Sequence, residues 1–255
     1  MSTLPGQREG LLAGRIVVVT AAAGVGIGAA TARRALEEGA TVAVSDRHEG
    51  RLAAAAEELA DLGTVLAVPC DVTRQAEVDR LLDTVEGELG PVDVMVNNAG
   101  LGGSATLDTM TDDDWFKVLD VSLNGTFRCT RAALRRMQPR GRGSIVNLAS
   151  VTGWRAEAGQ AHYAAAKAGV MALTRCAAVE AAPHGVRVNA VAPTLALHAF
   201  IEKVTEPEVI AHWVNEQPQG RPAEPREVAD VIVFLASDMA SYMTGEVLSV
   251  GAQHA

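Results

Sequence analysis

A strand, a glycine-rich turn, a helix and a second strand follow one another near the start of the chain, and this order constrains the fold more than any other feature. The two apolar, β-rich runs cover 15–20 and 41–45, with an amphipathic helical pattern over 26–38 between them. The turn carries three glycines, Gly24, Gly26 and Gly28. Glycine lets a backbone approach a pyrophosphate, and the helix that follows offers free N–H groups and a positive dipole end. The segment predicts a dinucleotide-binding βαβ unit in which Asp46 accepts hydrogen bonds from a ribose.

The alternation of strand and helix continues to the end of the chain. Strands are expected near 15–20, 41–45, 64–69, 92–96, 144–149, 186–191 and 246–250. Helices are expected near 26–38, 49–62, 74–88, 112–138, 160–182 and 226–237. This order predicts an α/β fold with a doubly wound, parallel, seven-stranded sheet, helices on both faces and ligands at the carboxyl ends of the strands.

Length and composition fit one domain. The 255 residues are 48% hydrophobic, which is enough for one substantial core, and no break in composition divides them. Residues 1–10 are expected to be frayed, and 11–255 to form a single dinucleotide-binding and catalytic domain. The longest weakly patterned segment, 194–225, contains four prolines. A long irregular segment in a compact domain is usually functional.

Charge and cysteine content argue against several classes of function. The formal charge of -9 argues against a surface for nucleic acid or for an anionic membrane. Cys70, Cys129 and Cys176 lie far apart, and no Cys-x2-Cys or histidine cluster offers a metal site, so we expect core thiols in a reducing compartment. Neither a signal-peptide pattern nor a membrane-spanning apolar run is found, and a cytoplasmic protein is predicted.

Ser150, Tyr163 and Lys167 form the strongest candidate catalytic set. Tyr163 and Lys167 are four residues apart in an alanine-rich helical run, so they lie on one face. A neighbouring ammonium is expected to lower the tyrosine pKa from about 10 toward that of a working general acid or base. Ser150, at the end of an apolar run, is placed to hydrogen-bond a substrate oxygen. Alone, such a pair is more often an exposed helical pair, but the upstream glycine turn and Asp46 favour catalysis.

Further motifs make the chain resemble the short-chain dehydrogenase/reductase superfamily from about Leu11 to Val250. They are Asn97-Asn98-Ala99-Gly100 after the fourth strand, Asp71-Val72 after the third, and the GVRVNAVAP segment that ends at Pro193. The resemblance implies a single-domain Rossmann fold, a nicotinamide cofactor, hydride transfer at a carbonyl or carbinol carbon, and a homotetramer. It also implies that 194–225 is a substrate lid.

The same resemblance assigns roles to individual residues. Tyr163 is implied to give or take the proton, Ser150 to orient the substrate oxygen, and Lys167 to modulate the tyrosine pKa and bind a ribose hydroxyl. Ser122 stands where the family usually has a catalytic asparagine and is expected to hold a water in its place. The expected cofactor-binding residues are Thr20, Gly24, Gly26, Ile27, Gly28, Asp46, Arg47, Asp71, Val72, Asn98, Ala99, Gly100, Val121, Tyr163, Lys167, Pro193 and Thr194.

Candidate substrate contacts are fewer. Trp154 and Arg155 follow Ser150 in a loop that borders the substrate in the family, and His198 lies in the implied lid. An apolar wall and a cation suit a bulky substrate with a carboxylate or phosphate. His162, beside the tyrosine, is expected to point away from the site and to have a packing or surface role. Three arginines at helical spacing, Arg128, Arg131 and Arg135, are interpreted as a solvated or subunit-interface face rather than an anion patch.

The chain also departs from the family pattern. Thr20 is followed by Ala21 where the family has glycine, and the loop to Gly26 is one residue longer, so we expect a reshaped pyrophosphate turn. The Pro-Gly after the sixth strand is Pro193-Thr194 here. In the family this last position lies near the nicotinamide and the substrate, so the change there bears on substrate identity more than on fold.

Together these features predict an NAD(H)-dependent oxidoreductase that interconverts a secondary alcohol and a ketone. NAD is expected over NADP because Asp46 repels a 2′-phosphate, although Arg47 next to it favours the phosphate. The resemblance is strongest to actinobacterial 3-oxoacyl-carrier-protein reductase-like enzymes, including dehydrogenases of steroid C- and D-ring CoA thioesters. Two alternatives stay open: a 3-oxoacyl thioester reductase of fatty acid metabolism, and a non-enzymatic dinucleotide-binding sensor or scaffold.

Overall fold

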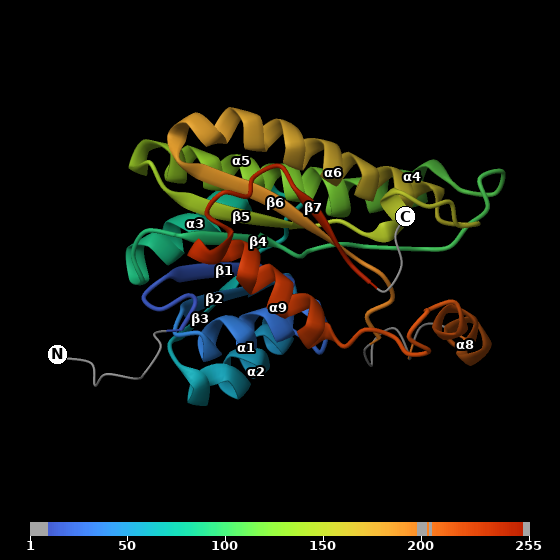
Figure 1. The fold of residues 1–255 in the computed structure, drawn as a ribbon, viewed down its shortest axis with the longest axis horizontal. Coiled ribbons are helices and arrows are strands. Elements are labelled where there is room, and N and C mark those ends of the chain that lie inside the picture. Colours follow the sequence, from blue (N-terminus) through green and yellow to red (C-terminus); the bar gives the residue numbers. More distant parts are fainter. Residues whose placement is uncertain (1–9, 198–202, 204–205, 252–255) are drawn as a thin grey trace.

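A seven-stranded, wholly parallel sheet forms the centre of the computed structural model, which describes residues 10–197, 203 and 206–251 (Figure 1). The strand order is β3-β2-β1-β4-β5-β6-β7. The strands are β1 Ile16–Thr20, β2 Thr41–Asp46, β3 Val65–Pro69, β4 Val94–Asn97, β5 Gly143–Leu148, β6 Val186–Pro193 and β7 Val247–Val250. The predicted doubly wound α/β fold is confirmed. Of the expected frayed segment 1–10, only Gly10 is among the described residues.

Helices cover both faces of this sheet. They are α1 Ile27–Glu37, α2 Glu49–Leu59, α3 Gln75–Glu88, α4 Asp112–Leu119, α5 Gly125–Met137, α6 Ala161–Ala181, α8 Pro207–Asn215 and α9 Pro225–Ala236. One layer contains α1, α2 and α9, and the opposite layer contains α3, α4, α5 and α6 (Figure 1). The central strands β1, β2, β4, β5 and β6 therefore have both faces buried, which explains why they read as continuous apolar runs.

Side chains of the central strands alternate between the two layers. In β1, Val17 and Val19 belong to the core under α1 and α9, while Val18 belongs to the core under α3 and α5. In β4, Val94 and Met95 divide in the same way. This alternation follows from the period of two in a strand, and it fixes the register of the sheet against both layers.

The chain changes direction across the sheet between β1 and β4. Strands β2 and β3 lie on one side of β1, and β4 to β7 lie on the other. The carboxyl ends of β1 and β4 therefore stand at a topological switch point, where ligands bind in open α/β sheets. The candidate residues that follow these strands are brought to this one edge.

The single helix predicted over 112–138 is divided in the structure. After α4, a π-helical turn covers Asp120–Asn124, and α5 then continues to Met137. A π-turn widens the helix by one residue and is found mostly at functional sites. Here it carries Ser122, whose side chain is fully buried. Sequence periodicity cannot show this turn because a buried polar partner from another segment sets it.

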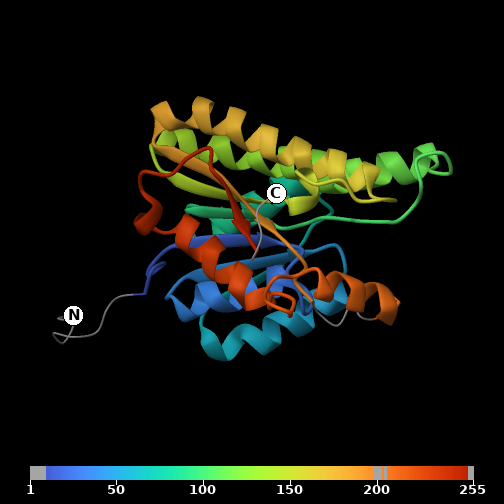
Figure 2. The ribbon, with the colours of Figure 1, turned by 45° about the vertical axis from the view of Figure 1, so that its right-hand side comes forward.

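The segment 194–225 contains a helix that the sequence reading missed. Helix α8 starts with Pro207 at its first position, where proline favours a helix instead of breaking it. In both views it lies at the end of the molecule toward which the β7 arrow points (Figures 1 and 2). The segment is tied at its base by a bridge between Ala196 and Ala223, and by a two-contact ion pair of Arg221 with Glu227. His198 lies outside the described residues.

The cysteines divide between core and surface. Cys70 and Cys129 are buried free thiols, as expected, but Cys176 is exposed on α6, so the expectation of three core thiols is wrong for it. An alanine-rich helix gives little periodic contrast between faces, which hid its outer side. Among the described residues there is no group of three metal-ligating side chains, and no helix is long and apolar enough to cross a membrane.

Candidate active site

Thr20 and Asn98 join the ends of β1 and β4 and shape the glycine turn. The Thr20 hydroxyl accepts hydrogen bonds from the N–H groups of Asn98 and Ala99, each at 3.0 Å. In return, Asn98 Nδ2 donates to the carbonyls of Thr20 at 3.0 Å and Ala21 at 3.1 Å. A Cβ on Gly28 would lie 2.5 Å from both the Ala21 carbonyl and Asn98 Nδ2, so only glycine fits there. These contacts hold the turn close to the start of α1.

Ala21 adopts the left-handed backbone conformation, with φ at 51°. Glycine takes this conformation freely, whereas an L-residue with a Cβ pays roughly 1–2 kcal/mol. The departure from the family's Thr-Gly therefore changes the residue but keeps the shape of the backbone. Gly26 precedes α1 without a side-chain cap, so the first N–H groups of the helix lack an intrahelical or capping partner. Such a helix start suits a phosphate.

Acidic groups follow β2 and β3 on the adenosine side of this turn. Asp46 Oδ1 accepts a hydrogen bond from the His48 N–H at 3.0 Å and lies 3.7 Å from Arg51. Burial tends to raise the pKa of Asp71, but hydrogen bonds from Thr73 outweigh it and, with the charge of Arg47, lower that pKa. Asp46 and Asp71 are therefore hydrogen-bonded acceptors at the edge where an adenosine is expected.

Lys167 is buried and bound to the end of β5. Its Nζ donates to the Leu148 carbonyl at 2.6 Å, lies 5.5 Å from the centre of the Tyr163 ring, and the residue is 3% exposed. Burial lowers the pKa of this ammonium from 10.5 to about 8. Leu148 is two residues before Ser150, so one strand end carries both the lysine's acceptor and the candidate catalytic serine. The sequence reading did not include Leu148, because a backbone carbonyl leaves no residue-type signal.

The expected lowering of the tyrosine pKa is not found. Burial raises the pKa of Tyr163 above its usual value, and a hydrogen bond with Ser150 only partly opposes this effect. The two residues do lie on one face of the helix, but desolvation of the phenol dominates its pKa. Ser150 itself is 8% exposed, and its hydroxyl donates to Thr152 Oγ1 at 3.1 Å. The three candidate catalytic side chains are brought together at the carboxyl edge.

Ser122 binds the backbone beside this set. Its hydroxyl accepts from the Leu101 N–H and donates to the Leu101 carbonyl, both at 2.9 Å. A Cβ on Gly100 would lie 3.3 Å from Lys167 Nζ and 3.7 Å from Ser122 Oγ, so both groups face Gly100. The one hydrogen of the hydroxyl is thus committed to Leu101, and only acceptor capacity is left for a water. Asn124 points elsewhere and donates to Asp120 at 3.2 Å.

The remaining predicted residues lie in less enclosed places. Trp154 is 42% exposed just after Ser150, and its N–H and that of Arg155 donate to the Val151 carbonyl. Strand β6 ends at Pro193. The N–H of the next residue, Thr194, donates to the Val250 carbonyl. The other expected cofactor residues lie on four segments. Gly24 is in the turn between β1 and α1, Ile27 is the first residue of α1, Val72 follows β3, and Val121 is in the π-helical turn.

Other residues singled out from the sequence lie away from the site or support it. His162 is buried, and its Nδ1 accepts from the Tyr163 N–H at 2.9 Å, in agreement with a packing role. Arg128 pairs with Asp120 at 2.7 Å, and Arg131 stacks on Phe127, so these arginines form part of the α5 surface. Thr111 caps α4 through the Asp114 N–H, ahead of three acidic residues.

Comparison with known proteins agrees with this geometry. A family described as enoyl-(acyl carrier protein) reductase, adh_short_C2, matches residues 21–252. The chain is 59% identical over 250 residues, 96% of its length and 95% of the relative's, to the (5R,7aS)-5-hydroxy-7a-methyl-1-oxo-2,3,5,6,7,7a-hexahydro-1H-indene-carboxyl-CoA reductase of Mycobacterium tuberculosis. It is 41% identical to the 3-oxoacyl-[acyl-carrier-protein] reductase FabG of Vibrio harveyi, covering 94% of this chain and 96% of that protein. The crystal structure of a short chain dehydrogenase from Mycobacterium smegmatis superimposes with a TM-score of 0.85, at 53% identity and 99% coverage of both chains.

The buried Lys167 predicts a specific pH dependence of stability. The lysine loses its proton near pH 8 in the folded protein and near 10.5 when unfolded, so between these values the unfolded state binds more protons. The free energy of unfolding should rise with pH in this window, relative to Lys167→Met, by a total on the order of 3 kcal/mol. Below pH 8 the difference between the two proteins should be constant. Urea unfolding at steps from pH 7 to 10.5 measures it. Lys117→Met, at an exposed lysine, serves as the control. The prediction is contradicted if the difference in unfolding free energy between wild type and Lys167→Met is as independent of pH as the difference for Lys117→Met.

Proposed function

Because this chain belongs to the short-chain dehydrogenase/reductase family, we propose that it is an NAD(H)-dependent oxidoreductase that interconverts a secondary alcohol and a ketone. The observation that carries the proposal is the meeting of Ser150, Tyr163 and Lys167 at the strand edge that also holds the glycine turn. A protein that only bound a dinucleotide would not require this set, and family membership with a named reductase relative sets the non-enzymatic alternative aside.

The residues present fit a nicotinamide dinucleotide. The start of α1 lacks a side-chain cap, and a Cβ on Gly24 would meet nothing within 4 Å, so the backbone there is open to a pyrophosphate. Asp46 stands at the end of β2, where a ribose hydroxyl would donate to it. When bound, the nicotinamide supplies or accepts the hydride, and the protein supplies position and proton transfer.

Tyr163 is the group that moves the proton in this proposal. Its raised pKa keeps the phenol protonated at neutral pH, which suits donation of a proton to a ketone oxygen. Ser150 shares a hydrogen bond with the phenol and can orient the same substrate oxygen. Lys167, with a pKa of about 8, is mostly cationic at pH 7 and holds positive charge beside the ring. Ser122 fixes the backbone between these groups and β4.

NAD is the proposed cofactor, with NADP less favoured. The Asp46 carboxylate would stand against the 2′-phosphate of NADP, and juxtaposed like charges cost several kcal/mol. The cationic side chains of Arg47 and Arg51 have the opposite effect, because they would attract the 2′-phosphate of NADP. Arg51 lies 3.7 Å from Asp46, and Arg47 acts on Asp71, so both cations already face carboxylates.

For the substrate, we propose an alicyclic ring that carries a CoA thioester. The support is the 59% identity, across nearly the whole chain, to a relative named for a hydroxy-methyl-oxo-hexahydroindene carboxyl-CoA. The exposed Trp154 ring beside Ser150 offers an apolar wall for such a ring. The second candidate is a 3-oxoacyl thioester, supported by the Vibrio harveyi relative. We also propose a cytoplasmic location, which suits the buried free thiols Cys70 and Cys129.

Self-association is a further part of the proposal, and the outer surface of α4 and α5 supports it. The amino-terminal half of this rod carries Asp112, Asp113, Asp114 and Asp120, and the carboxyl-terminal half carries Arg128, Arg131, Arg135 and Arg136. Phe116 is 63% exposed and Phe127 41% exposed along it. A rod that is acidic at one end and basic at the other complements an antiparallel second copy of itself.

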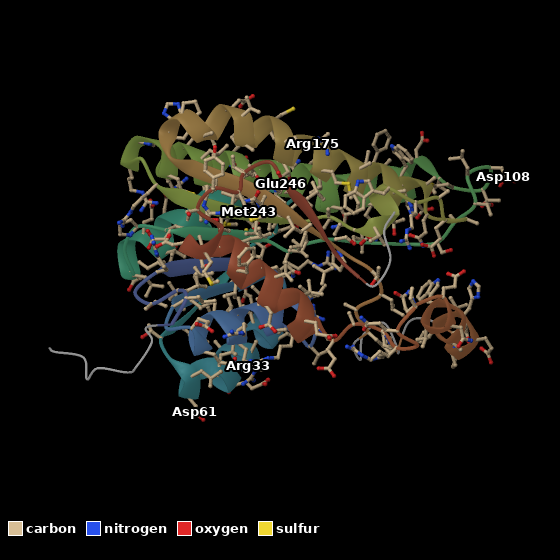
Figure 3. The ribbon with its side chains drawn as sticks, in the orientation of Figure 1. Arg33, Asp61, Asp108, Arg175, Met243 and Glu246 are labelled. Carbon is tan, nitrogen blue, oxygen red and sulfur yellow. The ribbon has the colours of Figure 1, made fainter. Side chains whose placement is uncertain are left out.

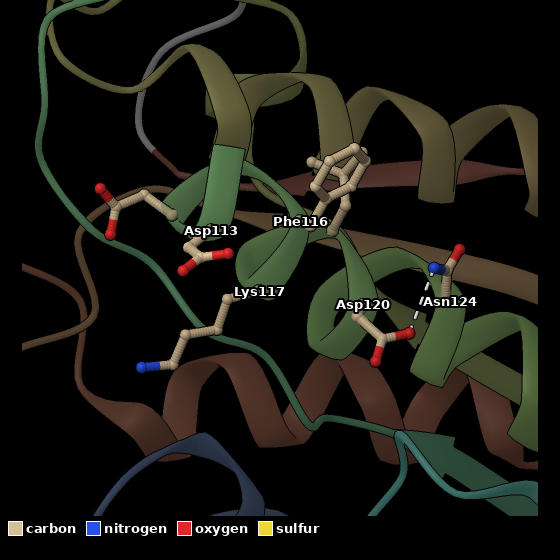
Figure 4. A pocket seen from close by; sticks show the side chains of 7 residues that line it. Asp113, Phe116, Lys117, Asp120 and Asn124 are labelled. Atoms are coloured by element: carbon tan, nitrogen blue, oxygen red, sulfur yellow. Dashed lines mark hydrogen bonds between the residues drawn. The ribbon is translucent and has the colours of Figure 1, made fainter. Parts of the chain in front are cut away.

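A hollow in the acidic half would receive the partner's basic half. It is lined by Asp113, Asp114, Phe116, Lys117, Leu119, Asp120 and Asn124 (Figure 4). In a two-fold arrangement centred on Asn124, Arg135 of one copy stands opposite Asp113 of the other, since each lies eleven residues from the centre. Arg135 is exposed and makes no ion pair with any residue that the structure describes. We therefore propose α4–α5 contacts within the expected homotetramer.

Removing the phenolic hydroxyl tests the proposed reaction. Tyr163→Phe should lower kcat by about a hundred- to ten-thousand-fold because general acid or base catalysis is lost, while NAD binding stays close to wild type. Turnover is followed at the nicotinamide absorbance with ring ketones, ring alcohols, their CoA thioesters and 3-oxoacyl thioesters. Tyr242→Phe, at the fully exposed second tyrosine, is the matched control. Retained turnover in Tyr163→Phe would overturn the assignment.

Titration with both cofactors tests the proposed preference. The wild-type protein should bind NAD more tightly than NADP, and Asp46→Asn should improve NADP binding by about tenfold or more, since a like-charge contact is removed. Asp61→Asn, an exposed carboxylate beyond α2, should leave both dissociation constants unchanged (Figure 3). If the wild-type protein binds NADP more tightly than NAD, and Arg47→Gln loses this preference, then Arg47 and not Asp46 decides which cofactor is preferred.

Charge reversal tests the proposed pairing of α4 and α5. Asp113→Arg and Arg135→Asp should each weaken self-association because like charges then meet across the two-fold axis. The double variant should restore it. Sedimentation equilibrium or light scattering on the three variants and the wild type measures the oligomeric state. A wild-type monomer, or single variants that associate like the wild type, would refute this interface.

A further inference from the structure

Four polar side chains are buried between the sheet and the helix layer that carries the catalytic residues. They come from β4, α5, β5 and α6, and are Asn97, Thr130, Asn147 and Thr174. Their exposed fractions are 2%, 2%, 0% and 0%. None of them takes part in the proton or hydride chemistry proposed above. We refer to them as the Asn–Thr network.

Hydrogen bonds run through this network in one direction. Asn97 Nδ2 donates to Asn147 Oδ1 at 2.8 Å and to Thr130 Oγ1 at 3.0 Å. Asn147 Nδ2 donates to Thr174 Oγ1 at 2.9 Å, and the Thr174 hydroxyl donates to the Val170 carbonyl at 2.8 Å. The series therefore crosses from β4 through the neighbouring strand β5 into the backbone of α6.

Core stability alone gives no reason for the network. Among the residues that the structure describes, buried Asn97 Oδ1 has no hydrogen-bond partner, and an unsatisfied buried acceptor destabilises a fold. Apolar side chains would fill the same layer without this cost, as the valines and methionines around it do. A buried polar network does, however, specify one relative placement of the elements that it joins, because its bonds have fixed length and direction.

Each member on the sheet stands next to a residue of the candidate site. Asn97 precedes Asn98, which holds the carbonyls of Thr20 and Ala21 in the glycine turn. Asn147 precedes Leu148, whose carbonyl accepts from Lys167 Nζ. On α6, Thr174 lies seven residues after Lys167, which is about two turns along the same face.

We propose that the Asn–Thr network is a positioning device that sets α6 along β5 and so places Tyr163 and Lys167 against Ser150 and the glycine turn. Helix α6 meets β5 through two side-chain hydrogen bonds two turns apart, from Lys167 to Leu148 and from Asn147 to Thr174. Packing against β6 holds the helix in its layer, and the two hydrogen bonds, about two turns apart, define its position along β5. Thr174 and Asn147 are thus positioning residues for the reaction, which makes this inference rest on the proposed function.

Paired substitutions at Thr174 test the inference. Thr174→Val keeps the shape but removes the hydroxyl, and it should lower kcat by about tenfold or more, because small displacements of catalytic groups cost one to two orders of magnitude. The dissociation constant for NAD should change by less than about twofold. Thr174→Ser keeps the hydroxyl and should retain most of the activity. Thr31→Val is the matched control, since among the described residues the hydroxyl of this buried threonine bonds to the Ile27 carbonyl of its own helix and to no other element.

A second readout does not depend on turnover. If α6 moves, Lys167 gains access to water, its pKa rises toward 10.5, and the gain in stability between pH 8 and 10.5 shrinks by about half or more in Thr174→Val. Tyr163 is a titratable neighbour on the same helix, with its ring centre 5.5 Å from Lys167 Nζ. Thr174→Ser and Thr31→Val should keep the wild-type pH dependence. If the protein turns over none of the substrates, this readout still decides the structural claim.

Two results would overturn the proposal. One is a folded Thr174→Val with wild-type kcat and wild-type pH dependence, which would make the network a structural element only. The other is an equal loss of kcat in Thr31→Val, which would show a general effect of removing a buried hydroxyl. Should Thr174→Val not fold, Thr174→Cys, with similar size and a weak acceptor, is judged by the same two readouts.

Discussion

The arrangement of the candidate site depends on one buried contact, the hydrogen bond from Lys167 Nζ to the Leu148 carbonyl. This bond joins α6 to the end of β5, with 2.6 Å between the nitrogen and the carbonyl oxygen, at a place where Lys167 is buried from solvent. Burial disfavours the charged ammonium and lowers the pKa of Lys167 to about 8. The Leu148 carbonyl accepts a hydrogen bond from one of the three N–H donors of this ammonium. The same burial raises the pKa of Tyr163. The contact therefore sets both where the groups stand and which protonation states they favour.

At two positions where the chain departs from the family pattern, the local geometry is kept by different physical means. Ala21 takes a left-handed conformation that glycine would take without strain, and Asn98 holds its carbonyl in place. Ser122, with a shorter side chain than asparagine, reaches the Leu101 backbone from a π-helical turn between α4 and α5. Gly100 lies between this serine and Lys167, and its lack of a side chain lets both approach. Strain and a widened helix turn thus accommodate residues that differ from the family pattern.

The two faces of the molecule have separate tasks. The layer of α1 and α9 contains the helix that starts at the glycine turn, and α6 in the opposite layer brings the candidate catalytic side chains Tyr163 and Lys167 to the same edge. The Asn–Thr network lies in the second layer and extends into the strand that leads to Asn98, so it joins the two binding regions through the sheet. Outside this body, α8 projects beside the strand ends with none of its residues buried.

The sequence by itself determined the order and type of the elements, the carboxyl-edge location of the candidate site, and the Ser150, Tyr163 and Lys167 set. These follow from local signals: apolar runs, glycine and proline positions, and a four-residue spacing on a helix. Only the tertiary structure decided the direction in which the Tyr163 pKa shifts and the hydrogen-bond partner of Ser122. It also decided that the helix over 112–138 is divided and that Cys176 is exposed. Each of these depends on desolvation or on a contact with a segment distant in sequence, such as Leu101 with Ser122 or Leu148 with Lys167. Burial is a property of the packed layers, and no local pattern of residues contains it.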